Sequence, residues 1–574
     1  MSARARSFIT AAAVALAAAM LSSCSQIPTS GPIEQGPSVI APGGEQGVRV
    51  IARPPSPGLD PVEIVRGFQE ATASQDTGFA VARQYLTDGA ARVWDPSEGV
   101  RVYDNTGLAL EDKGGTVVAT GVLNGVLDDA GQYTVASPGS TLDVEYGVVR
   151  VRGEWRIATL PPGLVLGRGD IDRGYRSFDL YYLTRDLTTL VPAPVTIPLT
   201  TSAMATQLVR GLLAGPTSWI APAVRTAFPE GTTLTLDSVP VLDGVASVDL
   251  SEQVLSADDA ARRALSAQLV WTLSQLPDVS LVRITVNGQP FVVPGAGADQ
   301  TADAWQSFDP SAYPDSATAY AVGDRGVLFS VDPRQRLAVA GRLSPVGLLP
   351  GLAVPTAGTS STKIAALSTD RRRVYEYVLG AVVQPGQERY AGTELSRPSY
   401  DRGGGFWTVD RGKGLLLVRG DTVTPVPVSG LPDGMDDGDL VGAAVSRDGT
   451  RMALLVQRGS RVEPMVARVE RGADRVRVAA PRRVDQSLTE SLDLVWGDAN
   501  TLVVLGSSGS TSLEVLRFSV GTATVRRVGA PVGAVTIAAA PGRAMLVGAA
   551  GKVYVNSGAS WNLVGVAADP TYPG

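Results

Sequence analysis

The 574-residue sequence contains no histidine. This absence excludes every Ser-His-Asp or Cys-His catalytic device and every histidine-ligated metal site. There is a single cysteine, Cys24, so neither an internal disulfide nor a cluster of thiolates can form. We therefore expect no metal and no cofactor, and a fold that core packing alone holds together.

The sequence also lacks an excess of basic charge. The chain has 50 lysines and arginines against 56 acidic residues, a net charge of −6. This balance argues against nucleic acid as a partner, because proteins that bind nucleic acid concentrate positive charge. Beyond the N-terminus, no apolar run approaches the roughly 20 residues that a membrane-spanning helix needs.

The composition that remains is that of a folded, strand-rich protein. Hydrophobic residues make up 44% of the chain and charged residues 18%, which suits domains with large cores. At about 150 residues per domain, the length predicts three or four domains. The 64 glycines and 39 prolines imply many turns, and hence a mostly β architecture.

The first residues have the parts of an export signal. Arg4 and Arg6 precede an apolar run and small residues, so we expect a signal peptide over 1–23. Residues 21–24, Leu-Ser-Ser-Cys, resemble a bacterial lipobox, in which the thiol receives a diacylglycerol. Cys24 is then the lipidation site, with palmitate among the acyl chains, and the mature chain is held on the extracytoplasmic face of the cell membrane. The alternative is a chance cysteine near a cleavage site.

Residues 24–59 are expected to be the lipidated cysteine and a tether. They are rich in proline and glycine and have little to bury. Such a segment reaches roughly 100 Å if it is polyproline-like and about 35 Å as a flexible coil. Residues 48–51 are the one stretch in it that can add an edge strand.

The next domain is expected over 60–165. Asp60 and Glu63 form a capping box around Pro61, and a helical apolar stripe follows. A second helix is expected over 76–86, ended by residues 87–89, and then strands, including a tight hairpin at 152–154. Two helices followed by a meandering sheet indicate an α+β cone of the NTF2-like kind. Such a cone either holds a ligand pocket or has a filled core.

A second α+β domain is expected over 176–298. A helix is predicted over 201–214, and Asp243-Gly244 marks a hairpin turn. Ser256 is expected to cap the next helix, with Asp259 three residues on. Residues 212–216, 243–251 and 269–273 closely resemble the GerMN domain, which recurs in envelope proteins. That resemblance implies a fold and a compartment rather than a reaction.

From about residue 315 to 570 short strands alternate with turns, and a degenerate motif recurs. Its turn positions, 370, 401, 448, 498 and 542, are separated by steps of 31, 47, 50 and 44 residues. Most of these steps match the roughly 40–50 residues of a four-stranded blade, which predicts an all-β propeller of five or six blades. Residues 319–331 and 552–564 are expected to close the ring. A β-sandwich with chance turns is the alternative.

Three short strings suggest chemistry. The acidic residues of 433–439 can wrap Ca²⁺, but the spacing is not that of an EF-hand, and a solvated loop is favoured. Residues 360–363 have the S-x-x-K spacing of serine acyl enzymes without the K-T-G that accompanies it. Residues 168–170 read Arg-Gly-Asp, a string short enough to arise by chance. We expect no catalytic site, so the protein is not expected to be an enzyme.

Taken in order, the lipobox, tether, NTF2-like domain, GerMN domain and propeller resemble the LpqB-type lipoproteins of actinobacteria. The resemblance implies an extracytoplasmic accessory protein that binds and modulates a membrane sensor kinase of the MtrA–MtrB two-component system. It ties the chain to envelope homeostasis and cell division. Two alternatives stay open: a cell-wall protein that binds glycans or acts on them through carboxylates, and a carrier that holds a small ligand in the NTF2-like cone.

Overall fold

The computed structural model describes residues 52–573, apart from gaps at 75–76, 200–202, 314–316, 332–335, 344–348, 352–361, 380–382, 384, 473–474, 510–511 and 523. The described residues belong to one compact unit. Cys24, the signal peptide, most of the tether and the strand expected at 48–51 lie outside them. Among the helices of the described residues, none is long and apolar enough to cross a membrane.

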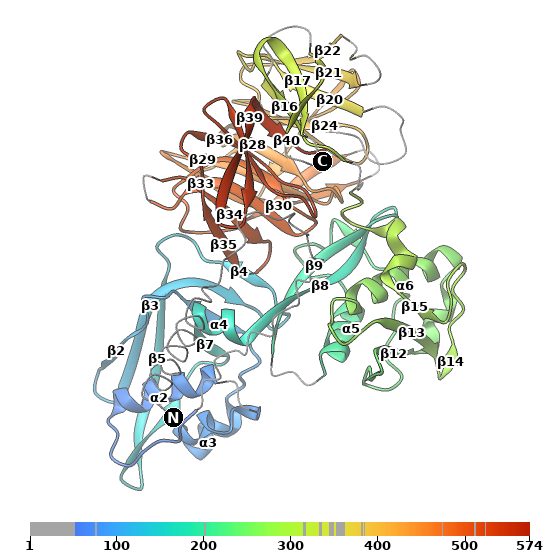
Figure 1. Ribbon diagram of the computed structural model, residues 1–574. Coiled ribbons are helices and arrows are strands. Elements are labelled where there is room, and N and C mark those ends of the chain that lie inside the picture. The colour runs from blue at the N-terminus through green and yellow to red at the C-terminus, as the bar shows by residue number, and fades with distance from the viewer. Residues whose placement is uncertain are drawn as a thin grey trace, which may run out of the picture. The chain divides into compact units, whose positions relative to one another are not determined.

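The N-terminal domain packs one long helix against a seven-stranded sheet (Figure 1). The helix, α2 (Pro61–Ala73), begins at the expected capping box, because Asp60 accepts from the N–H of Glu63 and the Glu63 carboxylate accepts from that of Asp60. The sheet has the order β6-β5-β3-β1-β7, with β2 and β4 paired to β3. Its strands are β1 (Val100–Tyr103), β2 (Ala109–Asp112), β3 (Thr116–Leu127), β4 (Tyr133–Val135), β5 (Thr141–Val151), β6 (Glu154–Thr159) and β7 (Leu164–Gly167).

The prediction of a second helix in this domain, over residues 76–86, is wrong. Two short 3₁₀ turns, η1 (Thr77–Phe79) and η2 (Ala82–Tyr85), stand in its place. Gly78 has a φ of 67°, which a continuous helix does not allow. The residues expected to end the helix begin one instead, since Thr87 accepts from the N–H of Ala90 and caps α3 (Asp88–Val93).

The middle domain has two sheets and two helices. α5 (Met204–Ala214) and α6 (Asp259–Leu273) are the expected helices. The parallel strands β12 (Val245–Leu250) and β13 (Leu281–Val286) flank α6 in the chain as a βαβ unit. The other strands are β8 (Tyr175–Thr184), β9 (Leu190–Pro198), β10 (Val224–Arg225), β11 (Val241–Leu242), β14 (Gln289–Pro290) and β15 (Asp299–Gln300), with α4 (Arg168–Gly174) before β8.

Of two local predictions in the middle domain, the hairpin turn is confirmed and the helix cap is wrong. Asp243 and Gly244 have φ values of 51° and 79°, the left-handed pair that a tight hairpin turn requires. The prediction that Ser256 caps α6 is wrong, because Ser256 is the last residue of the 3₁₀ turn η3 (Glu252–Ser256). Asp258 caps α6 instead, accepting from the N–H of Ala261 at 2.8 Å.

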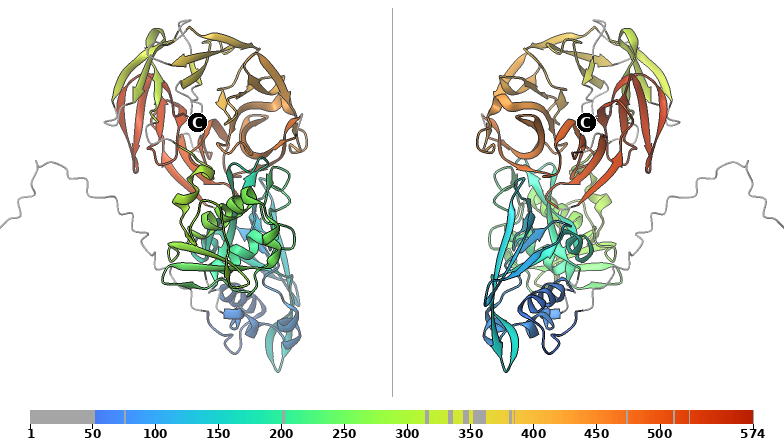
Figure 2. Two further views of the ribbon diagram at one scale, coloured as in Figure 1. Left: turned by 90° about the vertical axis from the view of Figure 1, so that its right-hand side faces the viewer. Right: turned by 90° about the vertical axis from the view of Figure 1, so that its left-hand side faces the viewer.

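The described residues from 320 to 571 form six sheets, numbered one to six in chain order, in which all strand pairs are antiparallel except β27 with β31. Figure 2 shows them following one another around a ring. Sheets one to three are β16 (Tyr320–Val322), β17 (Val327–Val331), β18 (Leu337–Arg342) and β40 (Ala568–Thr571); β19 (Leu349–Gly351), β20 (Thr362–Leu367), β21 (Arg373–Leu379) and β22 (Gln387–Ala391); and β23 (Ser399–Tyr400), β24 (Phe406–Asp410), β25 (Gly414–Arg419) and β26 (Thr422–Val426). Sheets four to six are β27 (Val428–Ser429), β28 (Leu440–Val445), β29 (Arg451–Arg458), β30 (Arg461–Arg471) and β31 (Val476–Arg483); β32 (Glu490–Trp496), β33 (Thr501–Ser507), β34 (Glu514–Ser519) and β35 (Val525–Gly529); and β36 (Ala534–Ala538), β37 (Leu546–Ala549), β38 (Lys552–Ser557) and β39 (Ser560–Val566).

The ring closes differently from the expectation. The last strand, β40, pairs with β16 and completes sheet one, whereas residues 552–564 lie in the outer strands of sheet six. Figure 2 shows the red C-terminal strands beside the yellow-green strands of sheet one. Closure thus depends on a strand that lies beyond the segment predicted to provide it.

The structure explains the irregular step in the repeat. The turn positions 401, 448, 498 and 542 each connect the two strands at the inner end of a sheet, namely β23 to β24, β28 to β29, β32 to β33 and β36 to β37. Position 370 instead connects β20 to β21, the two middle strands of sheet two. The step of 31 residues therefore joins two different turns, and the three longer steps are the true repeat.

Candidate functional site

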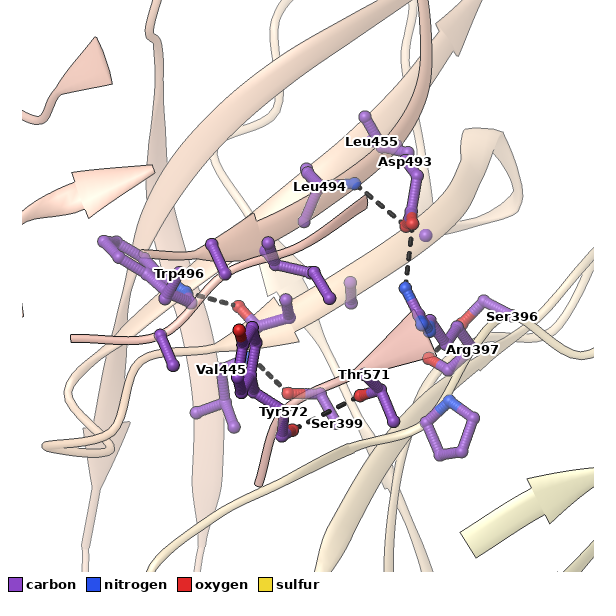
Figure 3. A pocket seen from close by; sticks show the side chains of 18 of the residues that line it. Ser396, Arg397, Ser399, Val445, Leu455, Asp493, Leu494, Trp496, Thr571 and Tyr572 are labelled. Carbon is purple, nitrogen blue, oxygen red and sulfur yellow. Dashed lines mark hydrogen bonds and ion pairs between the residues drawn. The ribbon is translucent and has the colours of Figure 1, made fainter. Parts of the chain in front are cut away.

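The inner strands of the ring surround a cavity of about 140 Å³ (Figure 3). Its walls come mainly from β23, β28, β32, β36 and β40. The cavity is the channel of the ring, and strands that are far apart in the sequence meet in it. Most of the polar side chains drawn in Figure 3 make hydrogen bonds or ion pairs with other groups of the protein. The Trp496 indole, for example, donates to the carbonyl of Ala444 at 2.9 Å.

An ion pair crosses this channel. The Arg397 guanidinium, just before β23, lies 2.8 Å from a carboxylate oxygen of Asp493 on β32. The same guanidinium donates to the main-chain carbonyls of Ile537 on β36, at 3.1 Å, and Pro570 on β40, at 2.7 Å. Asp493 in turn accepts from the N–H of Ile537 at 2.9 Å. One arginine therefore ties sheets three, five, six and one together.

Burial makes the carboxyl groups around Arg397 reluctant to ionise. Burial raises the pKa of Asp493, and Arg397 offsets this only in part. Burial also raises the pKa of Asp569. The charge of Arg397 lowers this pKa, and the charge of Asp493 raises it further. One carboxyl oxygen of Asp569 is buried and has no hydrogen-bond partner. Arg397 and Asp493 line the channel, and Asp569 is coupled electrostatically to both.

One end of the channel is covered. Arg447, in the turn after β28, donates to the carbonyls of Ser311 and Pro573 and stacks on the ring of Tyr313, 4.9 Å from its centre. Burial lowers the pKa of Arg447 to about 10, and the nearby Arg402 lowers it as well. The segment that leads into the ring and the C-terminal residues are both held against this end.

The other end of the channel is open and partly apolar. Leu492 on β32 and Val535 on β36 are exposed there, at the starts of the inner strands. Arg371, from the turn between β20 and β21, also lines the channel and donates through Nε to the carbonyl of Leu395 at 3.1 Å. Arg371 and the exposed aliphatic side chains together offer a surface that a partner protein can contact.

A second cluster joins the three domains at β9, the edge strand of the sheet β10-β8-β9. Pro192 and Pro194 have no N–H, so they leave no unpaired donor on the free edge. Their carbonyls accept from Arg451 of the ring at 3.3 Å and from Gln132 of the N-terminal domain at 2.7 Å. The Thr196 N–H donates to the carbonyl of Gly131 at 2.8 Å. The prolines prevent strand pairing here and direct the edge to two other domains.

Trp219 makes the second connection between the middle domain and the ring. Its indole N–H donates to the carbonyl of Ala480 at 2.8 Å, and its ring packs against the cores of both domains. Arg482 stacks on the indole at 5.1 Å, and Arg468 donates to the Trp219 carbonyl at 3.0 Å. A side chain shared by two cores couples the stability of one domain to that of the other.

A buried acid lies between these connections. Asp179 on β8 accepts from the side-chain amide of Asn500 at 2.9 Å. Burial raises the pKa of Asp179 to about 6, an effect that Arg451 opposes and Asp498 reinforces. Arg451 itself is fully buried and paired with Asp448 at 2.6 Å. The contact between β8 and the ring is therefore sensitive to the protonation of one carboxyl group.

The strings singled out in the sequence are not brought together. The acidic loop 433–439 contains the short turn η6 (Asp437–Asp439), which Asp436 caps by accepting from the Gly438 N–H. Within the described residues, no group of three or more acidic side chains is placed to hold a metal ion. Asp170 of the Arg-Gly-Asp string caps α4 by accepting from the N–H of Gly167 at 2.9 Å. Lys363 lies on strand β20, 3.6 Å from Glu376, and Ser360 lies outside the described residues.

The residues that shape the channel and its covered end were missed in the sequence. Arg402 and Arg447 lie beside the aspartates of two turn motifs, and this recurring Arg–Asp neighbourhood was a usable signal. No local signal marks Arg397 and Asp493, which are 96 positions apart.

Comparison with known proteins assigns all three parts of the chain. The family description "Lipoprotein LpqB, N-terminal domain" matches residues 54–172, "Sporulation and spore germination" matches 179–292, and "Lipoprotein LpqB beta-propeller domain" matches 326–573. The middle domain is thus a GerMN-type domain and the ring a β-propeller-type domain. Both agree with the expectation for these two parts.

Relatives extend the match to the whole chain. "Lipoprotein LpqB" of Thermobifida fusca is 31% identical over 98% of this chain and 99% of its own length. "Lipoprotein LpqB" of Streptomyces coelicolor is 28% identical over 97% of this chain and 96% of its own. Among solved structures, TolB from Acinetobacter baumannii covers 47% of this chain and 70% of its own at 15% identity, with a TM-score of 0.35, too slight a likeness to support an argument. With its order of domains and its near-complete overlap with these relatives, the chain belongs to the LpqB lipoprotein family.

Proposed function

We propose that this lipoprotein is a non-enzymatic accessory protein, anchored through Cys24 on the extracytoplasmic face of the membrane. In this role it binds and modulates a sensor kinase of the MtrA–MtrB type in envelope homeostasis and cell division. The propeller presents the open end of its channel to the partner.

The observation that carries this proposal is how the channel uses its charged groups. Arg397 and Asp493 are engaged with each other and with main-chain groups of neighbouring sheets, so they hold the ring together. The exposed groups at the open end include the aliphatic Leu492 and Val535 and the cationic Arg371. A rigid ring with such a rim suits recognition of a protein surface.

The anchor supports the same role. Two or more acyl chains give stable anchoring, and a tethered protein meets membrane-bound partners at high effective concentration. Membership of the LpqB family, a lipoprotein family, agrees with that location.

The test uses the full-length lipoprotein in nanodiscs together with the full-length kinase. We expect the lipoprotein to be co-purified with the kinase and to change its rate of autophosphorylation. Leu492→Glu and Val535→Glu should weaken the complex, whereas Leu242→Glu, at a more exposed aliphatic position of the middle domain, should not. Retention of the kinase by all three variants would place the contact elsewhere, and no retention by the unaltered protein would refute the proposal.

One observation favours a second candidate, carboxylate chemistry on wall glycans. Asp493 and Asp569 both have a raised pKa beside Arg397, and pairs of carboxyl groups carry out glycoside hydrolysis. Asp569→Asn should then abolish turnover of purified wall fragments. An unchanged fragment profile with the unaltered protein would exclude this candidate.

The N-terminal domain offers less support for a ligand carrier. We infer an NTF2-like cone here and six blades for the six sheets of the propeller. Phe68 packs edge-on against Trp94 at 5.3 Å and against Tyr146 at 6.1 Å, so aromatic rings fill the space between α2 and the sheet. Absence of any co-purified small molecule in native mass spectrometry would agree with that packing.

A further inference from the structure

The outer edges of the propeller sheets are protected to different degrees. A terminal strand presents unpaired N–H and C=O groups, and proteins guard such edges with charges, prolines or covering segments. Charged residues stand on β22, with Glu388 and Arg389, and on β35, with Arg526 and Arg527. Pro425 interrupts β26, and β27 covers the edge of β31 by pairing with it.

The edge of sheet six has none of these guards. Its outer strand β39 contains no charged residue and no proline over Ser560–Val566. Leu563 and Val566 on this strand are 57% and 70% exposed. Val339, on the outer strand β18 of the neighbouring sheet one, is 73% exposed. The two strands lie side by side, since a Cβ added to Gly565 would come within 2.7 Å of the Leu337 side chain.

The main-chain groups of β39 are available for pairing. The two-residue turn between β38 and β39 makes Ser557 and Ser560 a hydrogen-bonded pair, and such pairs alternate along an antiparallel ladder. The N–H groups of Trp561 and Leu563 therefore point to the outer edge. Among the described strands, β39 pairs only with β38.

The chain that leads through the last part of sheet five and through sheet six to this edge carries charge of one sign. From residue 515 to 568 the chain contains five basic residues and no acidic one; they are Arg517, Arg526, Arg527, Arg543 and Lys552. Lys552 lies directly across the ladder from Val566. Arg342 ends β18 and is exposed. An occupant of this edge meets the exposed Leu563 and Val566, with Lys552 and Arg342 as the basic residues nearby.

We propose that β39 accepts an extended segment of a partner protein as an added strand, with apolar side chains at its centre and acidic residues at its ends. Strand addition pairs the free main-chain groups, and the acidic ends meet Lys552 and Arg342. A second copy of this chain fits less well, because it would bring these basic residues together. An anionic membrane would satisfy the charges and the apolar side chains but would leave the main-chain N–H groups unpaired. This edge is a different surface from the channel, and a strand can add to it whether or not the partner is a sensor kinase.

The test uses the full-length lipoprotein in nanodiscs of neutral lipid and a fluorescent synthetic peptide in which glutamates flank alternating valine and threonine. Leu563→Pro removes one outward N–H and leaves the ladder to β38 intact, whereas Leu563→Ala keeps the N–H and removes the exposed side chain. We expect binding by fluorescence anisotropy, a loss of more than about tenfold in Leu563→Pro and a much smaller loss in Leu563→Ala. Hydrogen exchange in the unaltered protein should show slowed exchange at Trp561 and Leu563 when the peptide is added.

Other outcomes overturn the proposal. Equal losses in both variants would mean that the side chain, not the strand edge, is recognised. Binding to vesicles of anionic lipid with no slowing of exchange at Leu563 would assign the surface to the membrane. Concentration-dependent dimers that Leu563→Pro abolishes, with no peptide binding, would assign it to a second copy. If Leu563→Pro fails to fold, exchange protection at Trp561 in the unaltered protein still decides the question.

Discussion

Replacing Arg397 by methionine should destabilise the propeller strongly. The guanidinium is 20% exposed and its partner Asp493 is 14% exposed, so the pair is largely shielded from solvent screening. Removing one partner of a buried ion pair leaves the other charge uncompensated, which costs about 3–5 kcal/mol. The carbonyls of Ile537 and Pro570 lose their donor as well. A loss of this size is a large part of the 5–15 kcal/mol that a domain typically has.

The loss should also depend on pH in a defined direction. Burial raises the pKa of Asp493 even when Arg397 is present, and without Arg397 that pKa rises further. A carboxyl group whose pKa is higher in the folded than in the unfolded state favours folding when it is protonated. The loss of stability in Arg397→Met is therefore largest at pH values above the pKa of Asp493 in the folded state. It shrinks as the pH falls through that pKa toward the pKa of Asp493 in the unfolded state. It should be clearly smaller at acidic pH than at alkaline pH.

Calorimetry and hydrogen exchange can measure both effects. The propeller transition should shift in the calorimeter, and the amides of β36 and β40 should exchange faster, because Arg397 contacts both strands. Arg411→Met is a matched control, since Arg411 and Glu394 are about half exposed at 3.5 Å and contribute about 0–1 kcal/mol. Replacing both members, as Arg397→Met with Asp493→Leu, should recover part of the loss. A deficit below about 1 kcal/mol, or one that does not change with pH, would refute this reasoning.

Three further predictions concern the contacts between domains and the lipid anchor. The unaltered protein should gain up to about 2 kcal/mol of stability as the pH falls through 6 toward 4, because the pKa of Asp179 in the folded state is about 6. Asp179→Asn should remove this gain, and equal pH profiles of the two proteins in thermal unfolding would contradict the prediction. Trp219→Ala should cost about 3 kcal/mol and separate the unfolding of the middle domain from that of the propeller, whereas a single unshifted calorimetric transition would show that the indole does not couple them. Cys24→Ala should move the protein from the membrane to the soluble fraction with its circular dichroism unchanged, and full retention in membranes would rule out the lipid anchor.

Local turn chemistry could be predicted from the sequence, because it depends on a few adjacent residues. Asp243-Gly244 and the capping box at Asp60 are of this kind, and both occur as expected. The helix expected over 76–86 failed because Gly78 takes a left-handed conformation and Thr87 caps the following helix. Periodicity alone does not distinguish these outcomes.

Contacts between distant segments could not be predicted. The closing strand β40 is only Ala568–Thr571, and its Asp569 and Pro570 argue against a strand in any local pattern. Arg397, Asp493 and the edge of β9 acquire their roles only when separate sheets and domains meet. The family resemblance supplied the order of the domains, and the packing between them had to come from the structure.

The closing strand also sets an order of events for secretion. Val322 pairs with Ala568, so the two halves of this contact are 246 residues apart in the chain (568 − 322). A chain that leaves the cell from its N-terminus delivers β16 first, and the inner edge of that strand stays without a partner until β40 has crossed. Arg397 likewise has no Pro570 carbonyl to bind until then. The ring can therefore close only after β40 has been exported, and a chain stalled before β40 would expose strand edges that can pair with other proteins.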